Sequence, residues 1–265
     1  MSAPYIYGMH PNTLKRRLLD RQPCRGLWLC LPSVAVVRLL ARMEFDWLLV
    51  DVEHGPIGAE TMTQMVAAIA DAGRAPIVRL AQGNVENIKR ALDAGAWGVI
   101  APMVNSRAEA EAVVAAAKFP PMGQRSFGSA WAGLAFGLSM PEYRREANAQ
   151  TIVFAQVESA AALRDLPGIC GVPGLDGVFV GPVDLAISLG LEPNPENPHP
   201  ILRDALQEIL HAAYAHGLPV GIYCSSPQAA AERIRQGFLM VNVASDVGLL
   251  LQGARSALEW KPAVT

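Results

Sequence analysis

The chain has 265 residues, of which 51% are hydrophobic and 17% are charged, and its mean hydropathy is +0.23. A chain of this length and composition buries most of the surface that its unfolded form exposes, which excludes intrinsic disorder and a small disulfide-stapled scaffold. The 22 basic and 24 acidic residues leave a net charge of -2, without the basic excess typical of proteins that bind nucleic acid or anionic membrane surfaces.

The N-terminal segment lacks the pattern of a secretory signal, because its basic cluster is not followed by an apolar run. Apolar stretches elsewhere fall short of the roughly 18 residues that a membrane span needs. The four cysteines form no CxxC pair, which is typical of reduced thiols in the cytosol. We therefore expect a cytoplasmic protein that binds neither nucleic acid nor a membrane.

Eight short aliphatic and β-branched runs alternate with segments of helical periodicity, after a short helix expected at 12–21. Most of these runs are continuously apolar, as is typical of parallel strands covered on both faces. Helix-length segments such as 58–73, 84–95 and 106–119 separate them. The strands are predicted at 26–32, 46–52, 76–81, 98–104, 152–158, 176–182, 219–225 and 239–245.

Eight βα units in a chain of this size predict an α/β fold, a single (β/α)8 TIM barrel domain over residues 1–265. A doubly wound open sheet is the alternative. Such a sheet usually carries a glycine-rich fingerprint after its first strand, where this chain has Leu31-Pro32-Ser33-Val34. Two connections, 119–151 and 190–200, are too long for plain turns, and we expect active-site loops, lids or subunit contacts there rather than surface decoration.

Polar side chains gather where the predicted strands end, and that end of a barrel carries the chemistry. So many ionisable groups at one barrel mouth are difficult to explain as packing, because buried charges cost several kcal/mol unless they are paired or metal-bound. These residues are Asp51, Glu53 and His54 after the second strand, Arg79 in the third, Gln156 and Glu158 in the fifth, and Asp184 after the sixth.

The residue types indicate roles in catalysis. Glu158 and Asp184 are hard-oxygen ligands of the kind that hold Mg²⁺ or Mn²⁺ while leaving positions open for water and substrate. Asp51 and His54 are spaced so that the carboxylate can orient and charge-stabilise the imidazole, making it a better base near neutral pH. Arg79 is a permanently charged fork that suits a substrate oxyanion or carboxylate.

Glu53 is open to two interpretations, support of the Asp51–His54 pair or an outward salt bridge, and we favour support. A Schiff-base mechanism has no evident nucleophile, since no lysine lies at a predicted strand end. The four lysines are Lys15 before the barrel, Lys89 and Lys118 in helices, and Lys261 in the tail.

Four segments, in this order and spacing, resemble the class II (metal-dependent) pyruvate aldolases, the family of 4-hydroxy-2-oxoheptanedioate aldolase and 2-dehydro-3-deoxyglucarate aldolase. The similarity covers roughly residues 12–260 and includes Pro121-Met-Gly-Gln-Arg125. The four segments are Asp51-Val-Glu-His54-Gly-Pro, Ile77-Val-Arg79-Leu, Gln156-Val-Glu158-Ser and Phe179-Val-Gly-Pro-Val-Asp184-Leu.

The resemblance implies a lyase that reversibly adds the enolate of pyruvate, or a related 2-oxo acid, to an aldehyde. It also implies a divalent metal cofactor (Mg²⁺, Mn²⁺ or Co²⁺) and a homohexamer in which the last helix packs on a neighbouring subunit. The segment 246–260 agrees with the latter, because its apolar residues cover more than one helix face and favour a homo-oligomer.

By matching position, the resemblance assigns Glu158 and Asp184 as metal ligands and the Asp51–His54 dyad as the base. Arg79 becomes the clamp on the pyruvate oxygens. The substrate contacts implied in the same way are Trp28, Arg79, Gln156, Gly181, Pro182 and Arg125. The chain departs from the family pattern at Gly55 and at Gln124, Ser126 and Phe127 around Arg125. These departures put the identity of the aldehyde in doubt rather than the chemistry.

Two other functions compete with this one. A citrate-lyase-like enzyme acting on a coenzyme A thioester would need a longer chain or a basic surface for the nucleotide phosphates, and neither is evident. A barrel that binds a small acid without turnover would not need a base beside its carboxylate pair.

Overall fold

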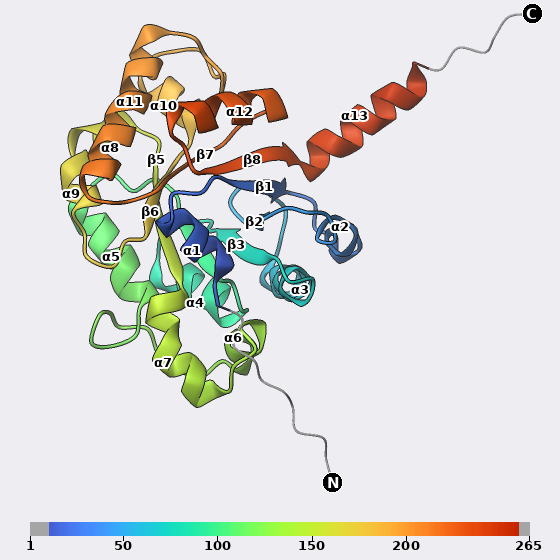
Figure 1. Ribbon diagram of the computed structural model, residues 1–265, viewed down its shortest axis with the longest axis vertical. Helices are drawn as coiled ribbons and strands as arrows, with labels where there is room; N and C mark the ends of the chain where they lie inside the picture. Colours follow the sequence, from blue (N-terminus) through green and yellow to red (C-terminus); the bar gives the residue numbers. More distant parts are fainter. Residues whose placement is uncertain (1–10, 260–265) are drawn as a thin grey trace, which may run out of the picture.

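The computed structural model describes residues 11–259, and its eight parallel strands form a closed barrel (Figure 1). Each strand is hydrogen-bonded to the next in the chain, and β8 closes on β1. The strands are β1 (Cys24–Leu29), β2 (Trp47–Asp51), β3 (Ala75–Arg79), β4 (Gly98–Ala101), β5 (Ile152–Val157), β6 (Gly177–Val180), β7 (Val220–Ile222) and β8 (Met240–Ser245). The predicted barrel is confirmed, and the open sheet is excluded.

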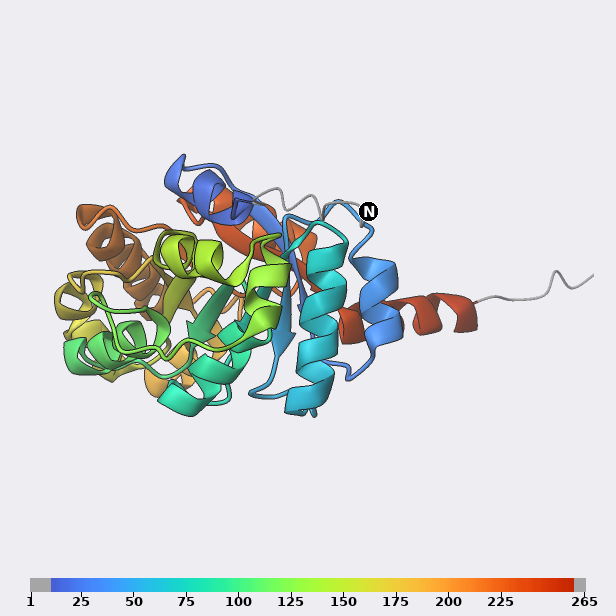
Figure 2. The ribbon, with the colours of Figure 1, turned by 90° about the horizontal axis from the view of Figure 1, so that it is seen from below.

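Helices surround the barrel between successive strands (Figure 2). In chain order they are α1 (Thr13–Leu19), α2 (Val34–Leu40), α3 (Ala59–Asp71), α4 (Val85–Asp93), α5 (Arg107–Ala117), α6 (Ala130–Ala135), α7 (Met140–Gln150), α8 (Ala160–Arg164), α9 (Leu166–Cys170), α10 (Pro182–Ser188), α11 (Pro200–Ala215), α12 (Pro227–Gln236) and α13 (Asp246–Leu258). No helix of the described part is long and apolar enough to span a membrane.

The strands are buried on both faces, which explains their continuous apolar runs. In β2, Leu48 and Val50 belong to the hydrophobic cluster shared with the surrounding helices, whereas Trp47 and Leu49 belong to a second cluster that fills the barrel. Because successive side chains of a strand point to opposite faces, Asp51 continues the inward series. The alternation of side chains along β2 therefore directs the Asp51 carboxylate into the barrel at the end of the strand.

The long segment 119–151 lies on the connection from α5 to β5 and contains α6 and α7 (Figure 1). A connection from a helix to the following strand reaches the barrel at the amino end of that strand. The segment therefore lies at the opposite end from the strand termini that carry the polar side chains, and the expectation of an active-site loop is wrong within this subunit.

Helix α13 projects away from the barrel, as Figures 1 and 2 both show. Its apolar side chains are exposed: Leu250 is 63% and Leu258 is 85% exposed. The base of the helix is nevertheless anchored, because the buried Asp246 carboxylate accepts hydrogen bonds from the backbone N–H groups of Cys30 and Leu31, both at 2.9 Å. The helix thus starts at the barrel mouth and leaves an apolar surface uncovered.

Candidate active site at the carboxyl ends of the strands

Asp51 and Arg79 form the best-defined polar pair at the carboxyl end of the barrel. They are register partners at the ends of β2 and β3, so the strand pairing itself brings them together. The Arg79 guanidinium donates from Nε to Asp51 Oδ1 at 3.0 Å and from Nη2 to Oδ2 at 2.5 Å. It also lies over the Trp28 ring, with Cζ 4.8 Å from the ring centroid. Arg79 is therefore held as a rigid fork.

The electrostatics of the pair follow from this contact. Burial by itself raises the pKa of Asp51, but the hydrogen bonds and the charge of Arg79 outweigh it and hold that pKa below its ordinary value. Burial likewise opposes the charge of Arg79, and the Asp51 hydrogen bond overcomes it and raises the arginine pKa. Both groups are therefore ionised at neutral pH.

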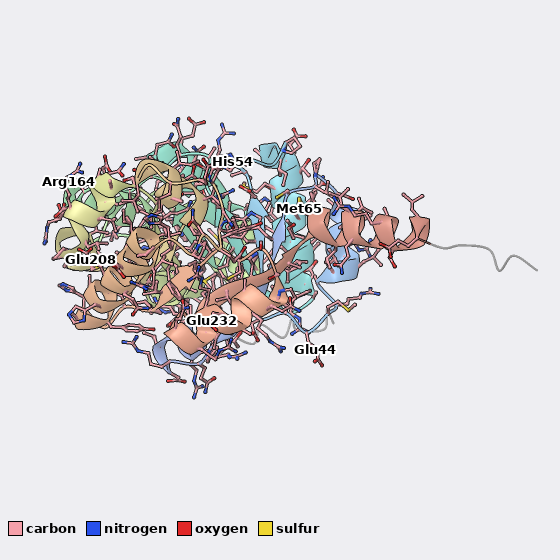
Figure 3. All side chains as sticks on the ribbon, turned by 90° about the horizontal axis from the view of Figure 1, so that it is seen from above. Glu44, His54, Met65, Arg164, Glu208 and Glu232 are labelled. Atoms are coloured by element: carbon pink, nitrogen blue, oxygen red, sulfur yellow. The ribbon has the colours of Figure 1, made fainter. Side chains whose placement is uncertain are left out.

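Asp51 was expected to contact the side chain of His54, but in the structure it contacts the backbone of that residue. Asp51 Oδ1 accepts the backbone N–H of His54 at 3.3 Å, and among the described residues the ion-pair partner of the ring is Glu53, with 3.9 Å between Nε2 and Oε2. The His54 side chain is 65% exposed (Figure 3). The physical reason is the strand register, which directs the Asp51 carboxylate to Arg79.

Glu158 lies one residue beyond β5, on the inward series that includes Phe154 and Gln156. It is 3% exposed, and its carboxylate accepts hydrogen bonds from the Gln156 amide and, at 2.7 Å, from the backbone N–H of Met103. Burial raises the pKa of Glu158, and the nearby charges of Glu53 and Asp184 add to the increase. A buried carboxylate in this setting is unfavourable without a cation.

Glu158 and Asp184 bring two carboxylates to this end of the barrel, and carboxylate oxygens are the ligands that a divalent cation such as Mg²⁺ takes. Within residues 11–259 Glu158 forms no ion pair with a basic side chain, and the second carboxylate raises its pKa further. A Cβ at position 181 would lie 2.3 Å from Glu158 Oε2, so Gly181 keeps the space beside this oxygen open. In the same range no group of three or more His, Cys, Asp and Glu side chains is arranged to hold a metal ion, so water and substrate would complete the coordination.

A cavity of about 410 Å³ opens at this end of the barrel, which is enough for a small substrate. It brings together the predicted residues Trp28, Asp51, His54, Arg79, Gly181, Pro182 and Asp184. It is also lined by Cys30, Val183, Tyr223 and Ser245, which the sequence analysis did not single out. The cavity therefore joins residues that lie in or just beyond β1, β2, β3, β6, β7 and β8.

The sequence could have identified some of these additional cavity residues. Cys30, Tyr223 and Ser245 lie at or just beyond the ends of their strands, and neutral side chains there are less conspicuous than charged ones. Met103 had no signal, because its backbone adopts a left-handed conformation with φ of 53° that a sequence gives no reason to expect of methionine. That conformation accompanies the N–H contact to Glu158.

Arg125 is a correction to the predicted substrate contacts. Its side chain is 1% exposed, donates to the Tyr143 hydroxyl at 2.9 Å and pairs with Asp93 at 2.8 Å. It lies between α5 and α6, on the connection that reaches the amino end of β5. Arg125 therefore stabilises the α6–α7 insertion and does not line the cavity at the strand carboxyl ends.

Lys118 also differs from the prediction, because it lies at the end of a helix and not within one. It ends α5 as its C-cap, is 1% exposed and pairs with Asp176, the residue before β6. Burial lowers the pKa of Lys118, and Asp176 opposes that shift. The side chain lies at the amino end of the barrel, so it gives no Schiff-base nucleophile at the site.

Comparison with known proteins yields a match over most of the chain. Residues 25–253 match the model of the HpcH/HpaI aldolase/citrate lyase family. A hydroxypyruvate/pyruvate aldolase from Rhizorhabdus wittichii is 36% identical over 239 residues, 90% of this chain and 94% of that protein. A 4-hydroxy-2-oxo-heptane-1,7-dioate aldolase from Escherichia coli is 37% identical over 245 residues, 92% of this chain and 93% of that protein. A crystal structure of a family protein from Burkholderia cenocepacia is 36% identical, with a TM-score of 0.86 over 94% of this chain and 98% of that one.

Proposed function

Because this chain belongs to the HpcH/HpaI aldolase/citrate lyase family, we propose that its barrel mouth joins pyruvate, or a related 2-oxo acid, to an aldehyde and cleaves the product. The chain is an aldolase, a carbon–carbon lyase, like the curated relatives that match 90% or more of its length. The observation that carries the proposal is a rigid Arg79 fork at the same end of the barrel as the buried Glu158 carboxylate, which forms no salt bridge among the described residues.

Arg79 acts as the clamp on substrate oxygens. Asp51 engages its Nε and one N–H of Nη2, and Glu53 Oε2 lies 3.3 Å from Nη1, so one proton on each terminal nitrogen stays available. Trp28 fixes the guanidinium plane by stacking against it. A preorganised donor of this kind stabilises the negative charge that develops on the keto oxygen as the enolate forms.

Glu158 and Asp184 would hold a divalent cation, Mg²⁺, Mn²⁺ or Co²⁺. When bound, such an ion supplies Lewis-acid polarisation of a keto oxygen, which acidifies the adjacent methyl group. The Gln156 amide and the Met103 N–H orient the Glu158 carboxylate by hydrogen bonds, as partners of ligands commonly do.

His54 would handle the proton. As a general base it accepts a proton from the methyl carbon of the 2-oxo acid, and the C–H electron pair becomes the enolate. In the cleavage direction, His54 accepts the proton of the 4-hydroxyl as the carbon–carbon bond breaks, and it returns this proton to the methylene carbon of the enolate. The exposed ring can turn toward a substrate held by Arg79, and catalytic contacts are often long before substrate binds.

The test of this function is turnover with pyruvate and a short aldehyde before and after exhaustive chelation. We expect activity to disappear on chelation and to return with Mg²⁺, Mn²⁺ or Co²⁺. Borohydride added with pyruvate should trap no covalent adduct. Full activity after chelation, or a trapped adduct on a lysine, would contradict the proposal.

The exposed face of α13 supports a homo-oligomer, which we propose is a hexamer. Leu249, Leu250, Leu251 and Leu258 are 39% to 85% exposed on a helix that leaves its own barrel, so a neighbouring subunit is the natural cover. Light scattering at micromolar concentration should give a multimer for the wild type and a smaller species for Leu250→Asp. A monomeric wild type would contradict this.

A further inference from the structure

Both oxygens of the Glu158 carboxylate are oriented by hydrogen bonds, and the two donors come from neighbouring strands. Oε2 accepts from the Gln156 amide on β5, and Oε1 accepts at 2.7 Å from the backbone N–H of Met103, two residues beyond β4. Since an ionised carboxylate offers about four lone-pair sites, about one site on each oxygen stays free for a cation. The Met103 N–H therefore helps to decide where the free sites of Glu158 point.

Met103 presents its N–H to Glu158 from an uncommon backbone conformation. Its φ is 53°, in the left-handed region that residues other than glycine rarely occupy. The Met103 side chain is 52% exposed, so its burial does not explain the conformation. Such conformations persist where the surroundings over-determine them, and they concentrate at functional sites. We therefore looked for the contacts that fix the backbone of this residue.

Asn105 makes the contact that fixes the Met103 backbone. Its Nδ2 donates to the Met103 carbonyl oxygen at 2.8 Å, on the other side of the residue from the N–H that Glu158 accepts. Asn105 is itself held in place, because its Oδ1 accepts the Ser159 hydroxyl and its backbone N–H donates to Glu109 at 2.6 Å. Ser159 directly follows Glu158 in the chain, so these contacts link the Met103 turn to both sides of the carboxylate.

We propose that Asn105 is a positioning residue for Glu158 and acts through the left-handed backbone of Met103. Its amide fixes the Met103 carbonyl, and the N–H of the same residue then orients one oxygen of Glu158. This inference rests on the proposed function, in which Glu158 and Asp184 hold a divalent cation. Asn105 does not line the cavity, so its effect on that cation is indirect.

The first test reads the Met103 N–H in the protein without metal. With ¹⁵N-labelled methionine, NMR follows the exchange of this proton with D₂O, and Met103→Gly identifies the signal by removing it. Asn105→Ala should speed the exchange by about tenfold or more, because the hydrogen bond to Glu158 opens more often. An unchanged exchange rate in Asn105→Ala would overturn the proposal, whether or not the protein binds a metal.

The matched control for this test is Ser106→Ala, one residue further along the chain. Ser106 is the N-cap of α5, and its hydroxyl accepts the backbone N–H of Glu109 at 3.3 Å. Loss of this cap should lower stability without changing the exchange of the Met103 N–H. Equally fast exchange in Ser106→Ala and Asn105→Ala would reduce Asn105 to a structural residue at the start of α5 and would overturn the proposal.

The second test is the affinity of the full chain for Mn²⁺, measured by titration calorimetry. Asn105→Ala should weaken binding by about tenfold, the lower end of what loss of a ligand-orienting partner causes. Adding Met103→Gly to this variant should restore the affinity to within about threefold, since glycine adopts the left-handed conformation without help from Asn105. Ser106→Ala should bind Mn²⁺ as the wild type does.

The outcomes separate this inference from the proposed function. Wild-type affinity for Mn²⁺ in Asn105→Ala, or a loss that Met103→Gly does not restore, would overturn the role of Asn105 and leave the metal site standing. A wild type that binds no Mn²⁺, together with faster Met103 exchange in Asn105→Ala, would contradict the proposed function. The same result would still support the positioning of Glu158 by Asn105.

Discussion

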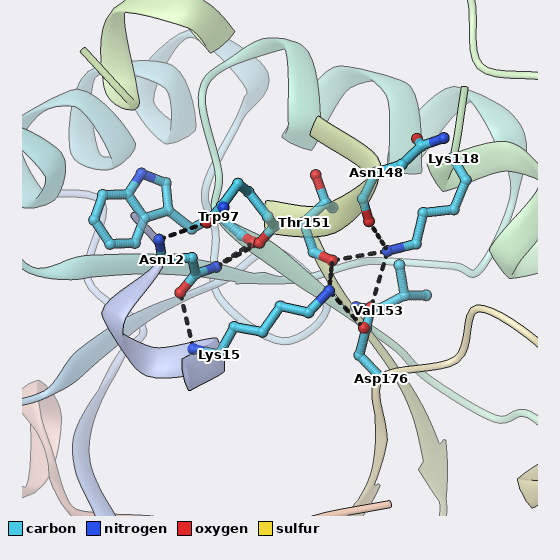
Figure 4. Close-up of polar contacts among 9 residues, drawn as sticks. Asn12, Lys15, Trp97, Lys118, Asn148, Thr151, Val153 and Asp176 are labelled. Atoms are coloured by element: carbon cyan, nitrogen blue, oxygen red, sulfur yellow. Dashed lines mark hydrogen bonds and ion pairs between the residues drawn. The ribbon is translucent and has the colours of Figure 1, made fainter. Parts of the chain in front are cut away.

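The two ends of the barrel each bury charged side chains, but they treat them differently. At the amino end, Lys15, Lys118 and Asp176 form a cluster, here called the lysine–aspartate cluster (Figure 4). Lys118 Nζ donates to Asp176 Oδ2 at 3.0 Å and to the backbone oxygens of Asn148 at 3.1 Å and Thr151 at 2.8 Å. Each of its three protons has an acceptor, and each Asp176 oxygen has a lysine.

At the carboxyl end, buried carboxylates keep hydrogen-bonding capacity that no partner uses. Glu158 is buried and forms no salt bridge within the described range, and Oε2 of Glu53 has only the Arg79 ion pair, at 3.3 Å, and no hydrogen bond there. At the amino end the Thr151 hydroxyl and Arg125 Nε also lack a hydrogen-bond partner, whereas every ionised group of the lysine–aspartate cluster has one. The paired charges of the lysine–aspartate cluster serve the fold, whereas buried carboxylates without a full set of partners mark a candidate ligand site.

The largest effect should come from Glu158→Ala, the change that removes a proposed metal ligand. Losing several kcal/mol of transition-state stabilisation corresponds to about 10³-fold or more in turnover. Metal titration by calorimetry, alongside turnover, checks it, and both signals should fall together. Retained metal affinity in this variant would contradict the assignment of ligand binding to the carboxyl end and of stability to the amino end.

The matched change at the other end, Asp176→Asn, should lower stability and leave chemistry intact. Two lysines would lose their shared carboxylate, and breaking a buried pair typically costs about 3 kcal/mol or more in the free energy of unfolding. Denaturant unfolding measures that loss, and kcat per folded molecule should equal the wild-type value. A large fall in kcat would assign the lysine–aspartate cluster a part in catalysis.

Arg79→Lys should lower turnover by about 10²-fold, because a point charge replaces the planar fork that grips Asp51 and aims at substrate oxygens. Arg125→Lys is the control, since Arg125 is also buried and paired with an aspartate but lies at the amino end. Steady-state kinetics of both variants should show a loss only for Arg79. Near-normal turnover of Arg79→Lys would make Arg79 structural.

A smaller effect concerns the pH dependence of stability at Asp51. Its folded-state pKa lies below the ordinary value of about 3.8, so its stabilising contribution is full above that value and is lost as the pH falls through the folded pKa. At neutral pH Asp51→Asn should cost about 2 kcal/mol in unfolding free energy, since charged hydrogen bonds are lost. The difference between the two proteins should stay constant down to about pH 4 and shrink below it. Thermal unfolding across that range tests this, and a difference that widens in acid would contradict it.

Much of the fold and the site could be predicted from the sequence. The continuous apolar runs located all eight strands, and the polar residues at the strand ends identified Asp51, Arg79 and Glu158 as site candidates. The local sequence pattern of each strand was enough for these predictions. Arg125 was placed wrongly, although the order of elements, a helix at 106–119 and a strand at 152–158, already assigned its segment to the amino end.

Other features depend on contacts that no local pattern specifies. The choice of Arg79 instead of His54 as the partner of Asp51 follows from the register of two strands. Lys118 was expected within a helix, and it is buried because α5 ends at that residue, next to Asp176. The left-handed backbone at Met103 has no signature in its neighbours.

The most direct test of the account is proton exchange without an aldehyde. With a divalent metal present, the wild-type protein should exchange the methyl protons of pyruvate with D₂O, as followed by NMR, because enolisation needs only the carboxyl end of the barrel. His54→Ala should slow this exchange by about 10²–10⁴-fold, the effect typical of a positioned base, with metal affinity nearly unchanged. Exchange at the wild-type rate in His54→Ala would contradict the assignment of His54 as the base.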